Sequence, residues 1–232
     1  MQISCVVLWE NLLQSIVYTA EYGGSVVSTI FQVLPGISTV PTYNEVLELA
    51  NMNINDFLSA IGVRRNVTVN VNLINIETYE RKTLIYDDIM VSDEEHYAWF
   101  YIDNIPGGSD CYYHRNVPID REVWEDELCT NLNAQKNQLT IRSNMEIGYQ
   151  WSFRRSAGQP AIVALSYGML AASLAKLTNG IIYTDDGAWD YSLFPVTAND
   201  FCMWYLKPEL AVSEEYRIMA QDCINRLRSE FK

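Results

Sequence analysis

The sequence predicts a mixed α+β fold: a central, largely antiparallel sheet with helices at its N- and C-terminal ends. Three patterns support this class. Residues 66–78 alternate between apolar and polar side chains, as a half-buried strand does. Residues 159–180 are apolar nearly all round, which is typical of a helix buried between layers. From about Ser213 onward, apolar side chains recur at helical spacing.

The length of 232 residues suits one domain over residues 1–232. The alternative is a division near residue 65, between a helical N-terminal part (1–65) and the sheet with its C-terminal helices (66–232). The apolar run at residues 3–18 has no basic start and is interrupted well short of ~20 apolar residues, so we expect neither a secretion signal nor a membrane span. A buried helix or strand is the expectation there.

Helix signals follow in residues 42–63. Thr42 and Glu45 have the spacing of a capping box, which predicts the start of a helix over residues 42–52. A second short helix is expected over residues 53–63, with Gly62 at its C-terminal end.

The middle of the chain predicts an antiparallel meander of three strands, at residues 66–78, 81–91 and 96–103. A loop is expected over residues 104–118 and a short acidic helix over residues 120–132. Two further strands are expected at residues 138–143 and 148–155.

The C-terminal third contains the clearest helix, residues 159–180, which Asn179 and Gly180 should end in the left-handed conformation. A strand is expected at residues 181–184, and a short helix before Pro208. In the last helix, Glu214 and Glu215 lie at the start and arginines lie near the end, an arrangement that suits the helix dipole.

The net charge of −13 is concentrated in a central acidic block, residues 77–127, which carries fourteen acidic and four basic residues. Such a block is either a set of solvated loops and exposed faces or a negative field that steers a cationic partner. Both explanations disfavour nucleic-acid binding, because neutralising phosphates requires a basic patch.

Motifs for enzymatic chemistry are absent from the sequence. There is no Walker A loop, nucleophile elbow, HExxH zinc motif or dinucleotide-binding glycine pattern. The five cysteines are scattered and form no CxxC pair, which is typical of a protein from a reducing cytoplasm. A dyad of Cys111 and His114 has no supporting spacing. We therefore expect no cofactor, no metal and no catalytic residue.

The segment LTNGIIYTDDGAWDY, residues 177–191, raises the main functional question. Its carboxylates could form a turn above a small aromatic core, since Asp186-Gly187 is a turn signal. Alternatively, they could bind a partner or a metal. A metal-dependent hydrolase would use paired aspartates, Asp87-Asp88 or Asp185-Asp186, although adjacent side chains of a strand point to opposite faces.

Residues 165–206, a buried helix rich in alanine and leucine followed by this segment and a short aromatic helix, resemble bacterial immunity proteins of polymorphic or contact-dependent growth-inhibition toxin systems. The resemblance implies a cytoplasmic, non-enzymatic protein that binds a cognate toxin domain. Such toxins are often basic nucleases, which agrees with the central acidic block. These families share no catalytic residues, so none is carried over.

We accordingly expect an acidic immunity protein whose partner is a basic toxin domain, with neither nucleic acid nor membrane as a partner. A metal-dependent hydrolase and a structural or adaptor module are the alternatives. The residues expected to contact the partner are acidic, with one tryptophan among them: Asp87, Asp88, Asp93, Glu94, Glu95, Asp185, Asp186, Trp189 and Asp190.

Overall fold

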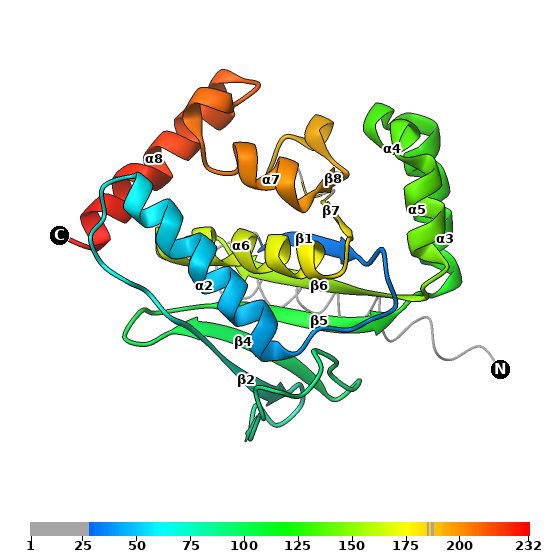
Figure 1. Ribbon diagram of the computed structural model, residues 1–232, viewed down its shortest axis with the longest axis horizontal. Helices are drawn as coiled ribbons and strands as arrows, with labels where there is room; N and C mark the ends of the chain where they lie inside the picture. The colour runs from blue at the N-terminus through cyan, green and yellow to red at the C-terminus, as the bar shows by residue number, and fades with distance from the viewer. Residues whose placement is uncertain (1–27, 185, 187) are drawn as a thin grey trace, which may run out of the picture.

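The computed structural model describes residues 28–184, 186 and 188–232, and it confirms the predicted α+β class (Figure 1). Within this part of the chain, antiparallel strands form one sheet in the order β3-β2-β4-β5-β6-β1-β7-β8. The strands are β1 (Ser28–Leu34), β2 (Val69–Asn75), β3 (Arg81–Lys82), β4 (His96–Ile102), β5 (Ser109–Arg115), β6 (Tyr149–Ser156), β7 (Ile181–Tyr183) and β8 (Val196–Thr197).

The helices are α2 (Tyr43–Ala60), α3 (Pro118–Thr130), α4 (Leu132–Lys136), α5 (Gln138–Met145), α6 (Ala161–Leu177), α7 (Ala198–Trp204) and α8 (Glu214–Glu230), with short 3-10 turns η1 (Tyr191–Leu193) and η2 (Pro208–Leu210). This confirms the predicted acidic helix, the buried helix and the final helix. In Figure 1, α2 and α6 lie in front of the sheet, while α3, α4 and α5 stand together at one end.

The N-terminal part differs from expectation. The apolar run at residues 3–18 lies outside the described residues. Residues 28–34 form β1, which lies inside the sheet between β6 and β7, so the described residues before 65 contain a strand of the main sheet as well as a helix. The two short helices expected in residues 42–63 are one continuous helix, α2. Its capping box is confirmed, because the Thr42 N–H donates to Glu45 Oε2 at 2.7 Å and the Glu45 N–H donates to Thr42 Oγ1 at 3.2 Å.

The predicted meander is wrong in its order. Strand β2 pairs with β3 on one side and directly with β4 on the other. Only Arg81 and Lys82 of residues 81–91 form a strand, because the remainder bonds to the start of α2. The expected loop over residues 104–118 contains strand β5. Residues 138–143, expected as a strand, belong to helix α5, which buries Ile141 and Met145 at helical spacing.

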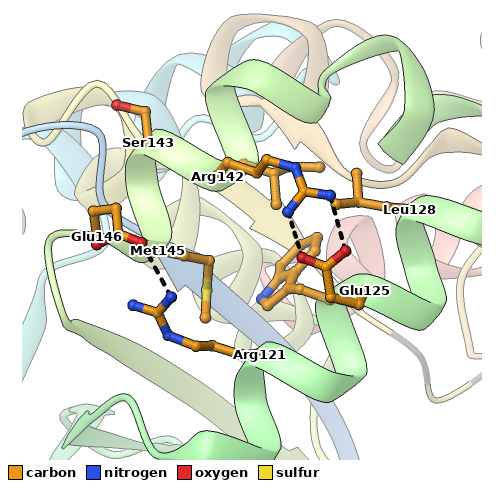
Figure 2. Close-up of a pocket in the computed structure, with 9 residues that line it drawn as sticks. Arg121, Glu125, Leu128, Arg142, Ser143, Met145 and Glu146 are labelled. Atoms are coloured by element: carbon orange, nitrogen blue, oxygen red, sulfur yellow. Dashed lines mark hydrogen bonds and ion pairs between the residues drawn. The ribbon is translucent and has the colours of Figure 1, made fainter.

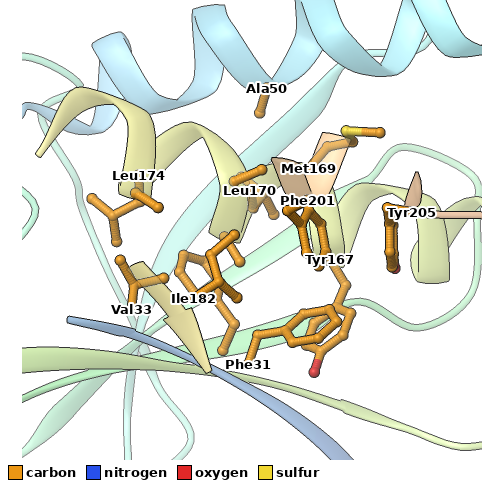
Figure 3. Close-up of a cluster of buried hydrophobic side chains, with 14 of the residues drawn as sticks. Phe31, Val33, Ala50, Tyr167, Met169, Leu170, Leu174, Ile182, Phe201 and Tyr205 are labelled. Atoms are coloured by element: carbon orange, nitrogen blue, oxygen red, sulfur yellow. The ribbon is translucent and has the colours of Figure 1, made fainter. Parts of the chain in front are cut away.

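The main core lies between the sheet and α6. Every residue of α6 from Ala161 to Ala175 is buried. Figure 3 shows Tyr167, Leu170 and Leu174 directed toward Phe31, Val33 and Ile182, with Ala50 of α2 on the opposite side of the helix. Because α6 is covered all round, its sequence has no polar stripe, as predicted.

Two contacts fix α6 in this layer. Gly168 lets the Tyr205 ring approach, since a Cβ there would lie 2.3 Å from two ring carbons; the Tyr205 hydroxyl donates to the Ala164 carbonyl at 2.6 Å. At the start of α6, Glu230 of α8 accepts from the backbone N–H groups of Ala161 and Ile162 at 2.7 and 3.1 Å. The last helix therefore caps the central one.

The open edge of β2 is closed by side chains of α2. The Asn55 amide pairs with both the N–H and the carbonyl of Val67, at 2.8 and 2.9 Å. Asn51 Oδ1 accepts from the Val69 N–H at 2.8 Å. These amides satisfy backbone groups that would otherwise be free at a sheet edge.

Candidate functional site

One strongly acidic part of the chain is an edge segment, residues 76–95, which runs from the end of β2 through β3 to the start of β4. It contains seven acidic and two basic residues. Its backbone is held at three points: the N–H groups of Tyr43 and Asn44 donate to the carbonyls of Asp88 and Tyr86, and the Ile76 N–H donates to the Glu95 carbonyl at 2.8 Å. The edge segment is therefore an ordered surface.

Asp87 and Asp88 lie beside the first turn of α2. Both side chains are exposed, and neither forms an ion pair with any described residue. The N-terminal end of a helix carries partial positive charge, which favours carboxylates nearby. These two acids thus have a local electrostatic role and remain accessible to a partner.

Asp93 has a structural role in the turn before β4. Its carboxylate accepts from the Glu95 N–H at 3.1 Å, lies 2.6 Å from His96 Nδ1 and lies 3.9 Å from Lys82 Nζ. The hydrogen bond with His96 lowers the pKa of the Asp93 carboxyl, and slight burial opposes this effect. In contrast, Glu94 and Glu95 are exposed and form no ion pair with the described residues.

Large apolar side chains are exposed among these acids. Tyr79 is 75 % exposed, Ile85 62 %, Ile89 55 % and Tyr86 42 %. Tyr79 also has a backbone φ of 58°, an unfavourable conformation for a bulky residue. A cluster of exposed apolar residues rimmed by charges is typical of a protein-binding surface. Sequence analysis identified the acids and missed these apolar neighbours, although Ile85, Tyr86 and Ile89 stand within five residues of sequence.

The second predicted acidic group lies in the turn after β7, and its side chains are used by the fold. The Asp186 carboxylate accepts from the backbone N–H groups of Ile30 and Ala188, at 2.5 and 3.0 Å. Asp190 Oδ1 accepts from the Ser192 N–H at 2.9 Å, which starts η1. Asp185 lies outside the described residues. The structure therefore favours the turn over the contact surface for Asp186 and Asp190.

Trp189 does not belong to a contact surface. Its side chain is only 3 % exposed, and its ring lies 5.4 Å from Phe31 and 5.1 Å from Tyr205, measured between centroids. A small aromatic core does lie beneath this turn, as the sequence suggested, and it includes Phe194, whose ring lies 5.5 Å from that of Trp204 in α7. Tyr191 is instead 38 % exposed, and its hydroxyl donates to Glu127.

The metal-ligating and nucleophilic side chains of the described residues bear on the sequence expectations. No cluster of three or more histidine, cysteine or acidic side chains there could hold a metal ion. Cys111 and His114 lie three residues apart on β5 and therefore face opposite sides of the sheet. Burial raises the pKa of the Cys111 thiol and lowers that of His114, which lies 3.0 Å from Ser152 Oγ.

A shallow hollow of about 310 Å³ lies between α3 and α5 (Figure 2). Two ion pairs cross it: Arg121 with Glu146 at 3.1 Å, and Arg142 with Glu125, where the longer of two contacts measures 2.8 Å. The Arg142 guanidinium lowers the pKa of the Glu125 carboxyl by hydrogen bonding. The Arg142 pair neutralises one acid of α3, Glu125, whereas Asp87, Asp88, Glu94 and Glu95 of the edge segment have no ion-pair partner among the described residues.

Comparisons with protein families, curated proteins and solved structures found no match for this chain. No helix in the described part of the chain is both long and apolar enough to cross a membrane.

Proposed function

We propose that this chain is a non-enzymatic binding protein, an immunity protein that neutralises a basic toxin domain by direct contact through the edge segment. The observation that carries the proposal is the combination of unpaired carboxylates with exposed apolar side chains on one segment, exemplified by Asp87 and Asp88 beside Ile85, Tyr86 and Ile89. The resemblance of residues 165–206 to immunity proteins supports the same function.

The two kinds of side chain would do different work in such a complex. Apolar groups favour association when a partner removes them from water, by about 25 cal/mol for each Å² that is buried before the entropic cost of association is subtracted. Unpaired carboxylates attract a cationic partner from a distance and reject an acidic one. A basic protein surface with an apolar centre would complement both features.

The backbone hydrogen bonds of the edge segment favour tight binding as well. Because the carbonyls of Tyr86 and Asp88 are fixed by α2, these residues are held in place before a partner arrives. Less conformational freedom is then lost on association. The closed edge of β2 limits an alternative mode, in which a partner strand would extend the sheet.

The test compares two triple charge reversals. D87K/D88K/E94K changes the edge segment, and D56K/E209K/D222K makes the same change of charge at exposed acids elsewhere. The proposed partner is a basic toxin domain, so the protein encoded by the gene immediately upstream is used as the probe, and its binding is measured by titration calorimetry and stopped-flow kinetics. We expect the first variant to bind at least tenfold more weakly and the control to bind nearly as the wild type does.

Rising salt should slow association of the wild type far more than it speeds dissociation. Equal effects of the two triple variants would show that the edge segment is not the contact surface. Hydrolase activity of the purified wild type that disappears with Asp87 and Asp88 would overturn the inhibitor proposal itself.

A further inference from the structure

Helix α8 is held in the fold by few apolar contacts. Only Ala220, Ile224 and Leu227 of its seventeen residues are buried, whereas α6, which has the same length, buries every residue from Ala161 to Ala175. In Figure 1, α8 lies at the opposite end of the molecule from α3, α4 and α5. Helices in proteins gain most of their stability by packing an apolar face. The position of α8 therefore depends on other contacts to a greater extent than that of α6.

One acidic side chain joins the last turn of α8 to the start of α6. Glu230 accepts from the Ala161 N–H through Oε1 at 2.7 Å and from the Ile162 N–H through Oε2 at 3.1 Å. Both N–H groups belong to the first turn of α6, where a helix has no acceptor of its own. Pro160, the residue before α6, provides no capping side chain. The Glu230 carboxylate therefore supplies a cap that the local sequence of α6 lacks.

Two arginines attach the same part of α8 to other segments. The Arg226 guanidinium donates to the Gln159 carbonyl at 2.8 Å, just before α6, and Arg228 Nε donates to the Ile61 carbonyl at 3.0 Å, at the end of α2. Within the described residues, no backbone hydrogen bond joins α8 to another helix or strand. The hydrogen bonds between α8 and the other described elements thus come from charged side chains in residues 226–230.

We propose that α8 is a strap, a helix that opens as a unit while the sheet and α6 stay folded, and that Glu230 is its fastening. Segments with few buried apolar contacts open at a lower free-energy cost than the core of a protein. Residues 211–213, of which Val212 and Ser213 are exposed, join η2 to α8 and form the hinge. This inference is independent of the edge segment and its partner.

Opening of the strap has a specific consequence for α6. The carboxylate that holds the end of α8 is the same group that caps α6, so both ends of this contact are released together. The N–H groups of Ala161 and Ile162 become accessible to water each time α8 leaves. Residues 165–175, which lie deeper in α6 and are buried on all sides, keep their hydrogen bonds.

Hydrogen exchange of the full-length wild type, measured residue by residue with NMR spectroscopy, tests the proposal. We expect the amides of residues 218–230 to be protected at least about tenfold less than those of residues 165–175, because opening of α8 leaves the core intact. The amides of Ala161 and Ile162 should share the low protection of α8. Equal protection of α8 and of residues 165–175 would show one cooperative unit and would overturn the proposal.

Glu230→Gln tests the fastening, since it keeps the size of the side chain and removes its charge. Hydrogen bonds to charged groups are stronger than those to neutral groups, so we expect exchange at Ala161, Ile162 and residues 218–230 to rise by about tenfold. Exchange of residues 165–175 should not change.

The matched control is Asp222→Asn, which neutralises an exposed acid on the same helix that makes none of these contacts. It should leave all of these exchange rates close to those of the wild type. Equal effects of the two variants would show that Glu230 is not the fastening. Circular dichroism should report a folded Glu230→Gln protein, and an unfolded one would contradict the proposal, because it would make α8 part of the same unit as the core.

Discussion

The carboxylates of the edge segment and those of the turn at residues 186–190 do opposite work. Asp87, Asp88 and Glu94 extend into solvent without an ion pair in the described part of the chain. Asp186 and Asp190 accept backbone N–H groups and so determine how the chain leaves β7. An acidic side chain near aromatic residues therefore indicates a contact surface only if its carboxylate is not already accepting hydrogen bonds from the backbone.

Replacing one aromatic residue in each region, Trp189 in the turn and Tyr86 in the edge segment, should give the largest difference in the free energy of unfolding. Trp189→Ala removes a side chain that packs on Phe31 and Tyr205, and we expect it to lower the free energy of unfolding by about 3–5 kcal/mol. Tyr86→Ala, at a side chain that is 42 % exposed, should change it by about 0.5 kcal/mol or less. Urea unfolding measures both. Similar losses would remove the distinction between the regions.

Asp186 gives the next largest effect. Asp186→Ala leaves the Ile30 N–H of β1 without its acceptor, and we expect a loss of about 1–3 kcal/mol in unfolding free energy. Asp186→Asn keeps an acceptor oxygen and should lose less. If thermal unfolding shows no change for Asp186→Ala, the carboxylate is not what holds this turn to the sheet.

The triple reversal D87K/D88K/E94K should lower the free energy of unfolding less, for each charge that it changes, than Asp186→Ala does. Exposed charges contribute about 0–1 kcal/mol each, although the loss of Asp87 and Asp88 beside the start of α2 will remove a small favourable dipole interaction. Circular dichroism should therefore report a folded protein. An unfolded variant would assign the edge segment a structural role comparable with that of Asp186.

Asp93 predicts a small dependence of stability on pH. The pKa of its carboxyl is lower in the folded chain than in the unfolded one, so the unfolded state binds the proton more tightly. The stabilisation is therefore complete above the usual aspartate pKa of about 4 and is lost as pH falls through the lower folded value. Its size is modest because the side chain is largely exposed.

Thermal unfolding of the wild type and of Asp93→Asn between pH 6 and pH 2.5 measures this contribution. The difference between the two proteins should shrink at the acidic end of the range. A difference that stays constant with pH would mean that the charge of Asp93 does not contribute.

Sequence patterns predicted the elements whose periodicity matches their burial. Helix α6 is covered on all sides, α8 has one buried stripe, and β2 alternates over its first residues, so each was recognisable. Strand β5 was not, because Asp110 and His114 make it look like a loop until Arg154 and Ser152 of β6 provide partners. Such partners belong to the tertiary structure and leave no trace in local sequence.

The candidate site was predictable to the same extent. Net charge identified the central acidic block, yet it could not separate Glu125, which is paired with Arg142 across α3 and α5, from the unpaired Asp87. Hydrophobic spacing could not show that Ile85 and Ile89 stay exposed, since their backbone is held outside the sheet by α2. Trp189 was assigned to the contact surface, whereas the structure places it in the core.

The position of β1 between β6 and β7 affects how the chain acquires its structure during synthesis. The pairing of Ser28 with Ser156 closes a loop of more than a hundred residues, while the β2–β3 and β4–β5 hairpins pair near neighbours. Ribosomes deliver about 5–20 residues each second. For several seconds, therefore, the nascent chain can hold its local hairpins but has no strand on either side of β1. Folding should be slow for a protein of this size because of such distant pairing, and holdase chaperones would encounter β1 as an unpaired apolar strand.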